Sequence, residues 1–151
     1  MVEVKVIQLP HYDLSFELPF YATEGAAGAD IRASLPEKKS IIVKPGERLL
    51  VPTGLAMEIP AGYEIQVRPR SGLSLKSPLM VVNSPGTLDS DYRGEVNIII
   101  GNFGNEDYVI EHGLRIAQLV IAPVIQAKFK TTNGLSETQR GAGGFGSTGT
   151  R

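Results

Sequence analysis

The stretch Val82-Asn83-Ser84-Pro85-Gly86-Thr87-Leu88-Asp89-Ser90-Asp91-Tyr92-Arg93-Gly94-Glu95 lies between two strongly apolar runs, residues 79–82 and 96–100. Pro85-Gly86 favours a turn, because proline presets one backbone angle and glycine tolerates positive φ. We therefore predict a hairpin with a broad tip. A loop that only reversed the chain would need about two to five residues. This longer loop carries an amide, two carboxylates and an aromatic ring, which suits it to hold and react with a small polar molecule.

The composition bounds the class of protein. The chain has 151 residues, no cysteine and a formal net charge of −1. One domain is expected at this length, and it needs neither a disulfide nor a structural metal. Near-neutrality predicts no broad cationic surface for a nucleic-acid polymer, and no apolar run is long enough to span a membrane. The N-terminus alternates charged and apolar residues, unlike a signal peptide, so we expect a soluble cytoplasmic protein.

Short strands separated by turn signals are predicted along most of the chain. Residues 2–6 and 63–68 alternate apolar and polar side chains, which is typical of half-buried strands. Residues 70–78 are the best candidate for the only helix, with Ser71 as its cap and Pro78 at its end. Together these signals predict an all-β fold, a jelly-roll-like sandwich or barrel. The other predicted strands lie at residues 30–34, 41–43, 48–52, 55–59, 79–82, 96–100, 108–110 and 115–121.

Two strands and the C-terminal segment depart from simple alternation. Ile98-Ile99-Ile100 and Leu119-Val120-Ile121 are apolar on both faces, which indicates subunit contacts or, alternatively, a very deep core. From Thr131 the chain becomes polar and then glycine-rich. Such a composition cannot join a core by itself. We therefore predict a β domain over residues 1–130 and a flexible arm over residues 131–151.

The arm carries side chains that a plain linker does not need. A bare glycine-rich tail is most simply disordered. Here, however, Arg140 precedes the glycines, Phe145 lies among them, and Ser147 and Thr148 follow. Backbone N–H groups with an arginine and two hydroxyls suit a phosphate chain. A lone phenylalanine can stack on a nucleobase, a contact worth roughly 1–3 kcal/mol.

Asp89 and Asp91 invite a metal-site interpretation. The chain has only two histidines and no cysteine, which argues against a zinc or iron cage. Magnesium remains open, because it keeps bound waters and is often held by substrate phosphates plus a carboxylate. Asp89, which follows the apolar Leu88, is the better candidate for a catalytic base. Ordinary solvated turn residues are the simpler alternative for both aspartates.

Two further segments carry candidate binding groups. Arg68, Arg70 and Ser71 stand at the mouth of the predicted helix and suit an anion site, with ordinary surface charge and a serine cap as the alternative. Gln118 is a lone amide among apolar neighbours, which is most often a satisfied buried polar group. Taken together, the candidates describe one pocket, with an amide and an aromatic ring for a base, arginine and N–H groups for phosphates, and a carboxylate for water.

Five stretches carry these candidates in order along almost the whole chain. They read Ala27-Gly28-Ala29-Asp30-Ile31-Arg32-Ala33, Arg68-Pro69-Arg70-Ser71-Gly72-Leu73-Ser74-Leu75-Lys76, Gly86-Thr87-Leu88-Asp89-Ser90-Asp91-Tyr92-Arg93-Gly94, Gly113-Leu114-Arg115-Ile116-Ala117-Gln118-Leu119 and Arg140-Gly141-Ala142-Gly143-Gly144-Phe145-Gly146-Ser147-Thr148-Gly149. In this order they resemble the five motifs of the homotrimeric dUTPase (deoxyuridine triphosphate nucleotidohydrolase) family. Leu88, where an isoleucine is common, is the one departure and is conservative.

The resemblance implies a jelly-roll trimer with three sites, each built from all three subunits. It implies hydrolysis of dUTP to dUMP and pyrophosphate with Mg²⁺ on the triphosphate, which limits uracil in DNA and supplies dUMP for thymidylate synthesis. Asp89 would orient and deprotonate the water that attacks the α-phosphorus. Asp30 would support the cluster of motifs. No residue is implied as a direct metal ligand.

The resemblance also divides the substrate among side chains. Asn83 and the backbone near Asn97 would recognise the uracil edge, and Tyr92 would leave no room for a 2′-hydroxyl. The phosphates would lie against the second and fourth motifs, and the arm would clamp them while Phe145 stacks on the base. The implied substrate-binding residues are Arg70, Ser71, Gly72, Asn83, Thr87, Leu88, Asp89, Tyr92, Asn97, Gln118, Arg140, Phe145, Gly146, Ser147 and Thr148.

Two other functions remain open at this point. A dCTP deaminase is an enzyme of another class on a similar fold, and it would release ammonia from dCTP. A non-catalytic β-sandwich module would bind or assemble without turnover. Nucleotide specificity distinguishes the first alternative, and the consequence of removing the Asp89 carboxylate distinguishes the second.

Overall fold

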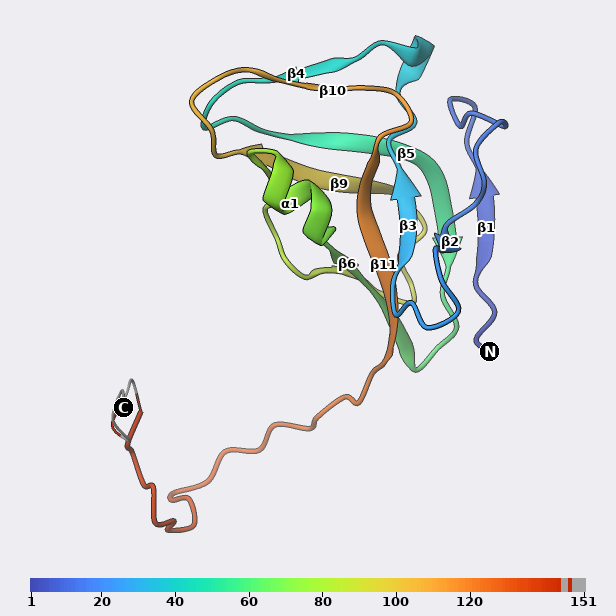
Figure 1. Cartoon of the computed structure of the whole chain (residues 1–151). Helices are drawn as coiled ribbons and strands as arrows, with labels where there is room; N and C mark the ends of the chain where they lie inside the picture. The colour runs from blue at the N-terminus through green and yellow to red at the C-terminus, as the bar shows by residue number, and fades with distance from the viewer. Residues whose placement is uncertain (145–146, 148–151) are drawn as a thin grey trace.

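Two antiparallel sheets form the body of the chain in the computed structural model, which describes residues 1–144 and 147 (Figure 1). One sheet has the order β1-β5-β9-β7, and the other has the order β2-β3-β11-β6-β8. A short pair, β4 with β10, lies apart from both. The strands are β1 (Lys5–Gln8), β2 (Phe20–Tyr21), β3 (Ala29–Arg32), β4 (Ile41–Val43), β5 (Arg48–Glu58), β6 (Tyr63–Arg68), β7 (Leu79–Val81), β8 (Gly86–Leu88), β9 (Glu95–Asn102), β10 (Tyr108–Ile110) and β11 (Arg115–Pro123). The expected all-β architecture is confirmed.

The core lies between the inward faces of the two sheets. Ile31 and Ile65 from the five-stranded sheet pack in one cluster with Ile98 and Ile100 from the four-stranded sheet. Alternation explains why these residues are inside, because every second side chain of a strand points to the same face. Ile99 follows the same rule and points outward beside Leu50, its cross-strand partner. Among the described residues, the outward side of the isoleucine run is therefore only partly covered.

Strand β5 differs from the prediction of two strands at residues 48–52 and 55–59. It is continuous, and its register against β9 shifts between Pro52 and Ala56. Gly54, with φ +69°, lies inside this β-bulge. A bulge lets the strand absorb extra residues and keep pairing on both sides. The break in the apolar pattern at Thr53-Gly54 thus marks a bulge and not a turn.

Other differences lie at short elements. The first strand begins at Lys5 and not at Val2, because its pairing with β5 starts at the partner Glu58. Strands β2 and β8 and a 3₁₀ helix, η1 (Pro36–Lys38), were not predicted. Each is only two or three residues long, too short to show a period.

The predicted helix is present as α1 (Ser71–Lys76), but the expected serine cap is wrong. Arg70 is the N-cap residue, no side chain caps the helix, and Ser71 is already its first residue. At the other end, the Ser77 hydroxyl donates to the Leu73 carbonyl at 2.8 Å, and Pro78 follows. Arg70 therefore enters the helix with an extended backbone, which frees its side chain for another contact.

The organising hairpin spans both sheets. Its flanks, β7 and β9, pair antiparallel as predicted. Its tip contains β8, which crosses to the other sheet and pairs with β6, placing Thr87 opposite Gln66. The broad tip is therefore long enough to bridge the sandwich, and it holds its polar residues at an edge of the five-stranded sheet.

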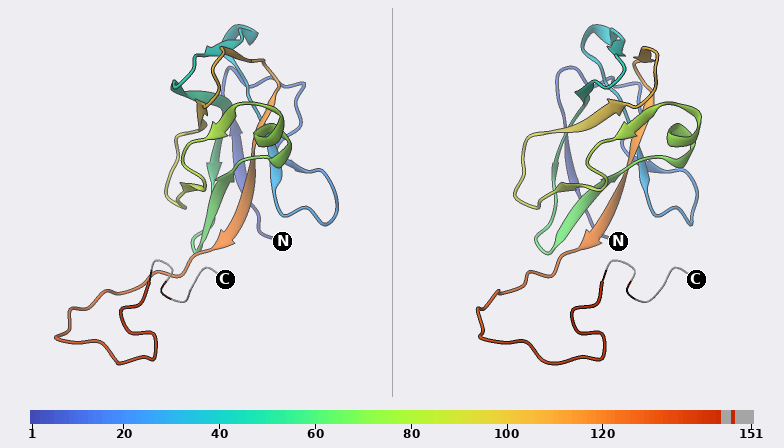
Figure 2. Two further views of the ribbon diagram at one scale, coloured as in Figure 1. Left: turned by 60° about the vertical axis from the view of Figure 1, so that its left-hand side comes forward. Right: turned by 90° about the vertical axis from the view of Figure 1, so that its left-hand side faces the viewer.

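The segment after β11 leaves this body. It extends away from the sheets (Figures 1 and 2), and residues 124–142 are exposed. No helix in the described part of the chain is long and apolar enough to cross a membrane.

Candidate functional site

A pocket lies at the tip of the organising hairpin. We call it the hairpin pocket, and its volume is about 260 Å³. Six of the residues predicted to bind substrate line it, namely Asn83, Thr87, Leu88, Asp89, Tyr92 and Asn97. The remaining lining residues are Leu50, Val67, Gly86, Glu95 and Ile99. The structure thus brings together an amide pair, a phenol and a carboxylate against an apolar floor.

Close backbone approaches shape this pocket. The Tyr92 hydroxyl folds back and donates to the Glu95 carbonyl at 3.0 Å. A Cβ on Gly94 would lie 2.3 Å from that hydroxyl, so only glycine leaves room for the ring. A Cβ on Gly86 would similarly lie 2.9 Å from the Asn83 amide nitrogen. The two glycines of the hairpin are therefore required by the positions of the neighbouring polar side chains.

Asp89 lies where the hairpin pocket meets a second, polar pocket of about 600 Å³. Glu64, Ser90 and Asp91 also line the second pocket. In the described part of the chain, the Asp89 carboxylate makes no hydrogen bond or ion pair. Asp89 is exposed to solvent. Such a group can accept a proton or a hydrogen bond from a water molecule.

A second group of predicted residues forms the arginine cluster, defined as Asp30, Arg70 and Arg115. The buried Asp30 carboxylate receives Arg70 Nε on Oδ1 at 2.7 Å and an Arg115 guanidinium nitrogen on Oδ2 at 3.1 Å. Arg70 also donates to the Arg115 carbonyl at 3.4 Å. Both Asp30 oxygens are therefore occupied, and Arg70 is held in place with donors left over, because a guanidinium has five N–H groups.

Gln118 lies beside the arginine cluster. In the sheet it stands opposite Asp30 on one side and Arg68 on the other. Its side-chain nitrogen donates to the Pro69 carbonyl at 2.9 Å. A Cβ on Gly28 would lie 2.2 Å from its Oε1, so the glycine makes room for this amide. Gln118 thus ties β11 to the segment that carries Arg70.

Sequence reasoning missed two residues of these sites. Arg115 completes the arginine cluster, and it stands three residues before Gln118 inside the fourth motif, so its position offered a signal. Glu95 lines the hairpin pocket just after the third motif. Nothing in the local pattern distinguishes Glu95 from an ordinary charged residue at the start of a strand.

Within one chain, the hairpin pocket and the arginine cluster remain separate. Arg70, Gly72 and Arg115 line a shallow pocket of about 330 Å³ together with Leu73, Lys76, Ser77 and Tyr108. It shares no lining residue with the hairpin pocket. Ser71 is exposed beside Arg70. The single chain therefore gathers the predicted residues at two places, one rich in amides and one cationic.

The arm residues stand apart from both places. Arg140 Nε donates to the Gly143 carbonyl at 2.8 Å, and Arg140 and Ser147 are exposed. Phe145, Gly146 and Thr148 lie outside the described residues.

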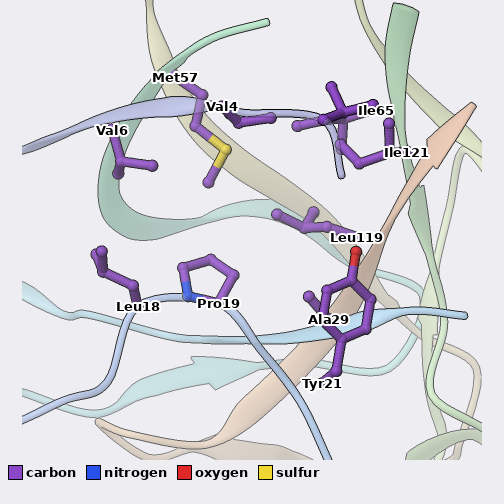
Figure 3. Close-up of a pocket in the computed structure, with 11 residues that line it drawn as sticks. Val4, Val6, Leu18, Pro19, Tyr21, Ala29, Met57, Ile65, Leu119 and Ile121 are labelled. Carbon is purple, nitrogen blue, oxygen red and sulfur yellow. The ribbon is translucent and has the colours of Figure 1, made fainter. Parts of the chain in front are cut away.

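An apolar pocket of about 240 Å³ lies elsewhere, between the sheets near β1 and β2 (Figure 3). Side chains such as Val4, Val6, Met57, Leu119 and Ile121 line it, and none of its lining residues is charged. It offers nothing to neutralise a phosphate chain and is not a candidate for the substrate site.

No group of three or more histidine, cysteine, aspartate or glutamate side chains that could hold a metal occurs among the described residues. Glu64, Asp89 and Asp91 line the polar pocket without forming such a group. This donor set does not suit a fully protein-bound cation. It fits a hydrated Mg²⁺ that is held mainly by substrate phosphates.

The two-sheet fold, the hairpin pocket with its unpaired carboxylate and the separate arginine cluster define a β-sandwich hydrolase for a small anionic substrate. The model of the dUTPase family matches residues 15–149. The deoxyuridine 5′-triphosphate nucleotidohydrolase of Roseobacter denitrificans is 56% identical over 149 residues, which cover 99% of this chain and 97% of the relative. That of Chlamydia felis is 61% identical over 136 residues, covering 88% and 91%.

Solved structures agree with these relatives. The dUTPase of Staphylococcus bacteriophage 80alpha with dUPNHPP is 28% identical and superposes with a TM-score of 0.85 over 97% of this chain and 98% of that one. A variant of the phage phi11 dUTPase, in which a structural Mg(II) ion is coordinated, superposes with a TM-score of 0.75 at 24% identity, covering 87% and 97%.

This chain belongs to the dUTPase family. Its activity is the hydrolysis of dUTP to dUMP and pyrophosphate, and the family typically uses Mg²⁺. The resemblance inferred from the five motifs is confirmed, and the deaminase and non-catalytic alternatives are set aside.

Proposed function

We propose that the nucleoside of dUTP binds in the hairpin pocket, and that its triphosphate reaches the arginine cluster of a neighbouring subunit. Asp89 then directs water at the α-phosphorus. One observation carries this proposal: the hairpin pocket places Asn83, Tyr92 and the unpaired Asp89 carboxylate around one cavity.

The uracil and the deoxyribose are recognised by the hairpin. Strand β8 is the last strand of its sheet, so one of its edges carries backbone groups that no described strand pairs. An edge of alternating N–H and C=O groups matches uracil, which offers one donor between two acceptors. Asn83 and Asn97 add amide groups from either side, and Thr87 and Leu88 provide the edge itself. Tyr92 packs against the sugar and leaves no space for a 2′-hydroxyl.

The phosphates are held by Arg70, Ser71, Gly72 and Gln118. Asp30 supports these binding residues by holding Arg70 in place, since the two Asp30 oxygens accept hydrogen bonds from Arg70 and Arg115. The first turn of α1 presents N–H groups beside the guanidinium donors. Together these groups match the oxygen-rich surface of a triphosphate.

A homotrimer would join the hairpin pocket to the arginine cluster. The single chain separates them, and it exposes apolar side chains that a soluble surface does not need. Leu50 is 60% exposed beside Ile99 on the outward face of the four-stranded sheet, and Ile125 and Phe129 in the C-terminal segment are each 95% exposed. Burial of these side chains between subunits would both stabilise the assembly and complete the site.

The chemical step starts at Asp89. Its carboxylate accepts a proton from a water molecule as that water attacks the α-phosphorus, and pyrophosphate leaves. General-base assistance of this kind contributes roughly 10²–10⁴ in rate. When bound to the triphosphate, Mg²⁺ neutralises negative charge there. The residues of this chain would hold it through water and through the phosphates they bind, without a cage of carboxylates.

The arm of residues 131–151 closes over the bound nucleotide. Arg140, Ser147 and Thr148 clamp the outer phosphates, Phe145 stacks on uracil, and Gly146 lets the backbone approach. Closure excludes water and strengthens the charge contacts.

A chain truncated after Gln139 is expected to retain its fold and assembly but to lose most turnover. Full turnover by that truncated chain would refute the lid. A nucleotide substrate of this kind also implies action in the cytoplasm.

Mixing two inactive variants tests the shared site. Asp89→Asn and Arg70→Ala should each be nearly inactive alone. If the carboxylate and the arginine of one site come from different subunits, trimers formed by refolding the two variants together contain some intact sites, and activity returns. If both come from the same chain, every site carries a defect and no activity returns. Sedimentation checks that the mixture is trimeric.

A further inference from the structure

Glu95 connects the hairpin pocket to the bulge in β5. Its backbone carbonyl accepts the Tyr92 hydroxyl at 3.0 Å and the Asn97 side-chain nitrogen at 3.3 Å. Two side chains of the hairpin pocket are therefore oriented by one peptide group. The position of that peptide decides where both of them stand.

The side chain of Glu95 is anchored on the opposite side, at the bulge. Its Oε1 accepts the Gly54 N–H at 2.8 Å. That N–H lies in the part of β5 where pairing with β9 is interrupted, between Pro52 and Ala56. The carboxylate thus takes over the role of a missing ladder partner. A donor left without a partner here would be costly, since Gly54 is buried.

His11, from the N-terminal segment, also holds the Glu95 carboxylate. Its Nε2 donates to the same Glu95 oxygen at 2.8 Å, and the two side chains are about equally shielded, at 25% and 20% exposed. The neighbouring Tyr12 packs tightly on the bulge, because a Cβ on Gly54 would lie 2.8 Å from its Cα. His11 therefore reaches Glu95 from a segment that is itself fixed against β5.

We propose that Glu95, held by His11 and the Gly54 N–H, is a positioning residue that fixes Tyr92 and Asn97 and so sets the preference for deoxyribose over ribose. This inference rests on the proposed binding of the nucleoside in the hairpin pocket. Glu95 does not touch the reacting phosphorus in this scheme. It acts through the placement of Tyr92, and so its loss should affect KM and sugar selectivity more than kcat.

The test compares dUTP with UTP as substrates of the full-length enzyme. Glu95→Ala should raise KM for dUTP about 10-fold and lower the dUTP-over-UTP ratio of kcat/KM by a similar factor, with kcat within about 3-fold, as expected for the loss of one or two hydrogen bonds. Glu95→Gln keeps an oxygen for the Gly54 N–H and should recover most of the selectivity. His11→Ala removes half of the anchor and should shift the ratio in the same direction by about 3-fold.

A matched control is Glu58→Ala, which removes a carboxylate of β5 that pairs only with the exposed Lys5 in the described structure. It should leave the dUTP-over-UTP ratio of kcat/KM unchanged.

Tyr92→Phe removes only the hydrogen bond of the hydroxyl. Combining it with Glu95→Ala should lower the dUTP-over-UTP ratio no further than the stronger single variant does, because both substitutions act on the same contact.

Two outcomes overturn the proposal. If Glu95→Ala lowers the melting temperature but leaves the dUTP-over-UTP ratio within 2-fold of the parent, Glu95 is only structural. If Glu95→Ala does not fold, an unchanged ratio in His11→Ala overturns it instead. The parent enzyme separates these results from a failure of the proposed function, in which the parent itself would not discriminate dUTP from UTP or Asp89→Asn would remain active.

Discussion

Asp30 and Asp89 are both aspartates of the motif stretches, yet the fold treats them in opposite ways. Asp30 is buried at 8% exposure, and each of its oxygens accepts a hydrogen bond from a different arginine. Asp89 is exposed at the meeting point of two pockets, and its carboxylate has no partner among the described residues. A saturated carboxylate holds other groups in place, whereas an unsaturated one is available to a water molecule.

The difference follows from where each residue stands in the sheets. Asp30 lies within β3, between Phe20 of β2 and Gln118 of β11. Its carboxylate is reached there by Arg115 of β11 and by Arg70 at the N-cap of α1. Asp89 follows the last residue of β8, the edge strand, and no other strand of the described residues pairs beyond it. A central position favours structural pairing, and an edge position leaves room for a ligand.

The largest effect is expected for Asp89→Asn. The amide cannot accept the proton of the attacking water, so kcat should fall by roughly 10²–10⁴. Because the Asp89 carboxylate makes no hydrogen bond or ion pair in the described structure, the melting temperature should stay within about 2 °C, in line with the roughly ±0.5 kcal/mol of typical surface substitutions. Steady-state kinetics and thermal unfolding measure the two quantities. Retained turnover would mean that another group activates the water, and a large loss of stability would contradict the contrast with Asp30.

Asp30→Ala should combine a loss of stability with weaker binding. It leaves Arg70 and Arg115 without their shared acceptor, and the free energy of unfolding should fall by about 1–3 kcal/mol. KM for dUTP should rise, because Arg70 is no longer oriented. Urea unfolding and kinetics test this on the same preparation. Asp30→Asn is the matched variant, since it keeps the shape and one acceptor oxygen and should be less affected in both measurements.

Asp13, which lies outside the five motif stretches, offers a second saturated carboxylate for a test by pH. It receives Lys38 Nζ at 2.6 Å, the Ser15 hydroxyl at 2.7 Å and His112 Nε2 at 3.0 Å. Lys38 first, and then Ser15 and His112, hold the pKa of Asp13 well below its usual range. The folded state thus favours the ionised form, and this contribution to stability is present above the unfolded pKa of about 4.

The contribution should be lost as the pH falls from about 4 through the lower folded pKa. The stability difference between the parent and Asp13→Asn, measured by urea unfolding, should therefore be largest near neutral pH and should shrink in acid. Taking the difference removes the effects of other groups that titrate in the same range. A difference that grows toward low pH would show that the sign of the coupling is wrong.

The degree to which these sites could be predicted depends on whether their signal is local. Asn83, Asp89 and Tyr92 share one loop with residue types that a simple turn does not need, so the sequence indicated the hairpin pocket directly. The contact of Asp30 with Arg115 joins residues 85 positions apart and depends on the pairing of β3 with β11. No local pattern contains that register.

The strands likewise divide into those with a local sequence signal and those that depend on distant pairing. Alternation over residues 63–68 predicted β6 with its observed bounds, since the strand is half-buried along its length. Strand β8 was missed because its three residues take their strand conformation from pairing with β6, and Gly86 by itself indicates a turn. Likewise, Thr53-Gly54 resembles a break between strands, and only the partner β9 and the carboxylate of Glu95 make it a bulge.

Asp91→Asn should have the smallest effect on turnover, and it tests whether the position of Asp89 matters more than its charge. Asp91 lines the polar pocket with Asp89 but is absent from the lining of the hairpin pocket, only two residues away. If the position at the junction of the two pockets, and not simple acidity, makes Asp89 catalytic, Asp91→Asn should change kcat/KM by less than about 3-fold, within the range of typical surface substitutions. Steady-state kinetics of Asp91→Asn and Asp89→Asn, measured side by side, give the two changes in kcat/KM. A loss comparable to that of Asp89→Asn would instead show that the two carboxylates act together on the hydrated Mg²⁺ or the attacking water. Asp30 would then have to be compared with both aspartates of the loop and not with Asp89 alone.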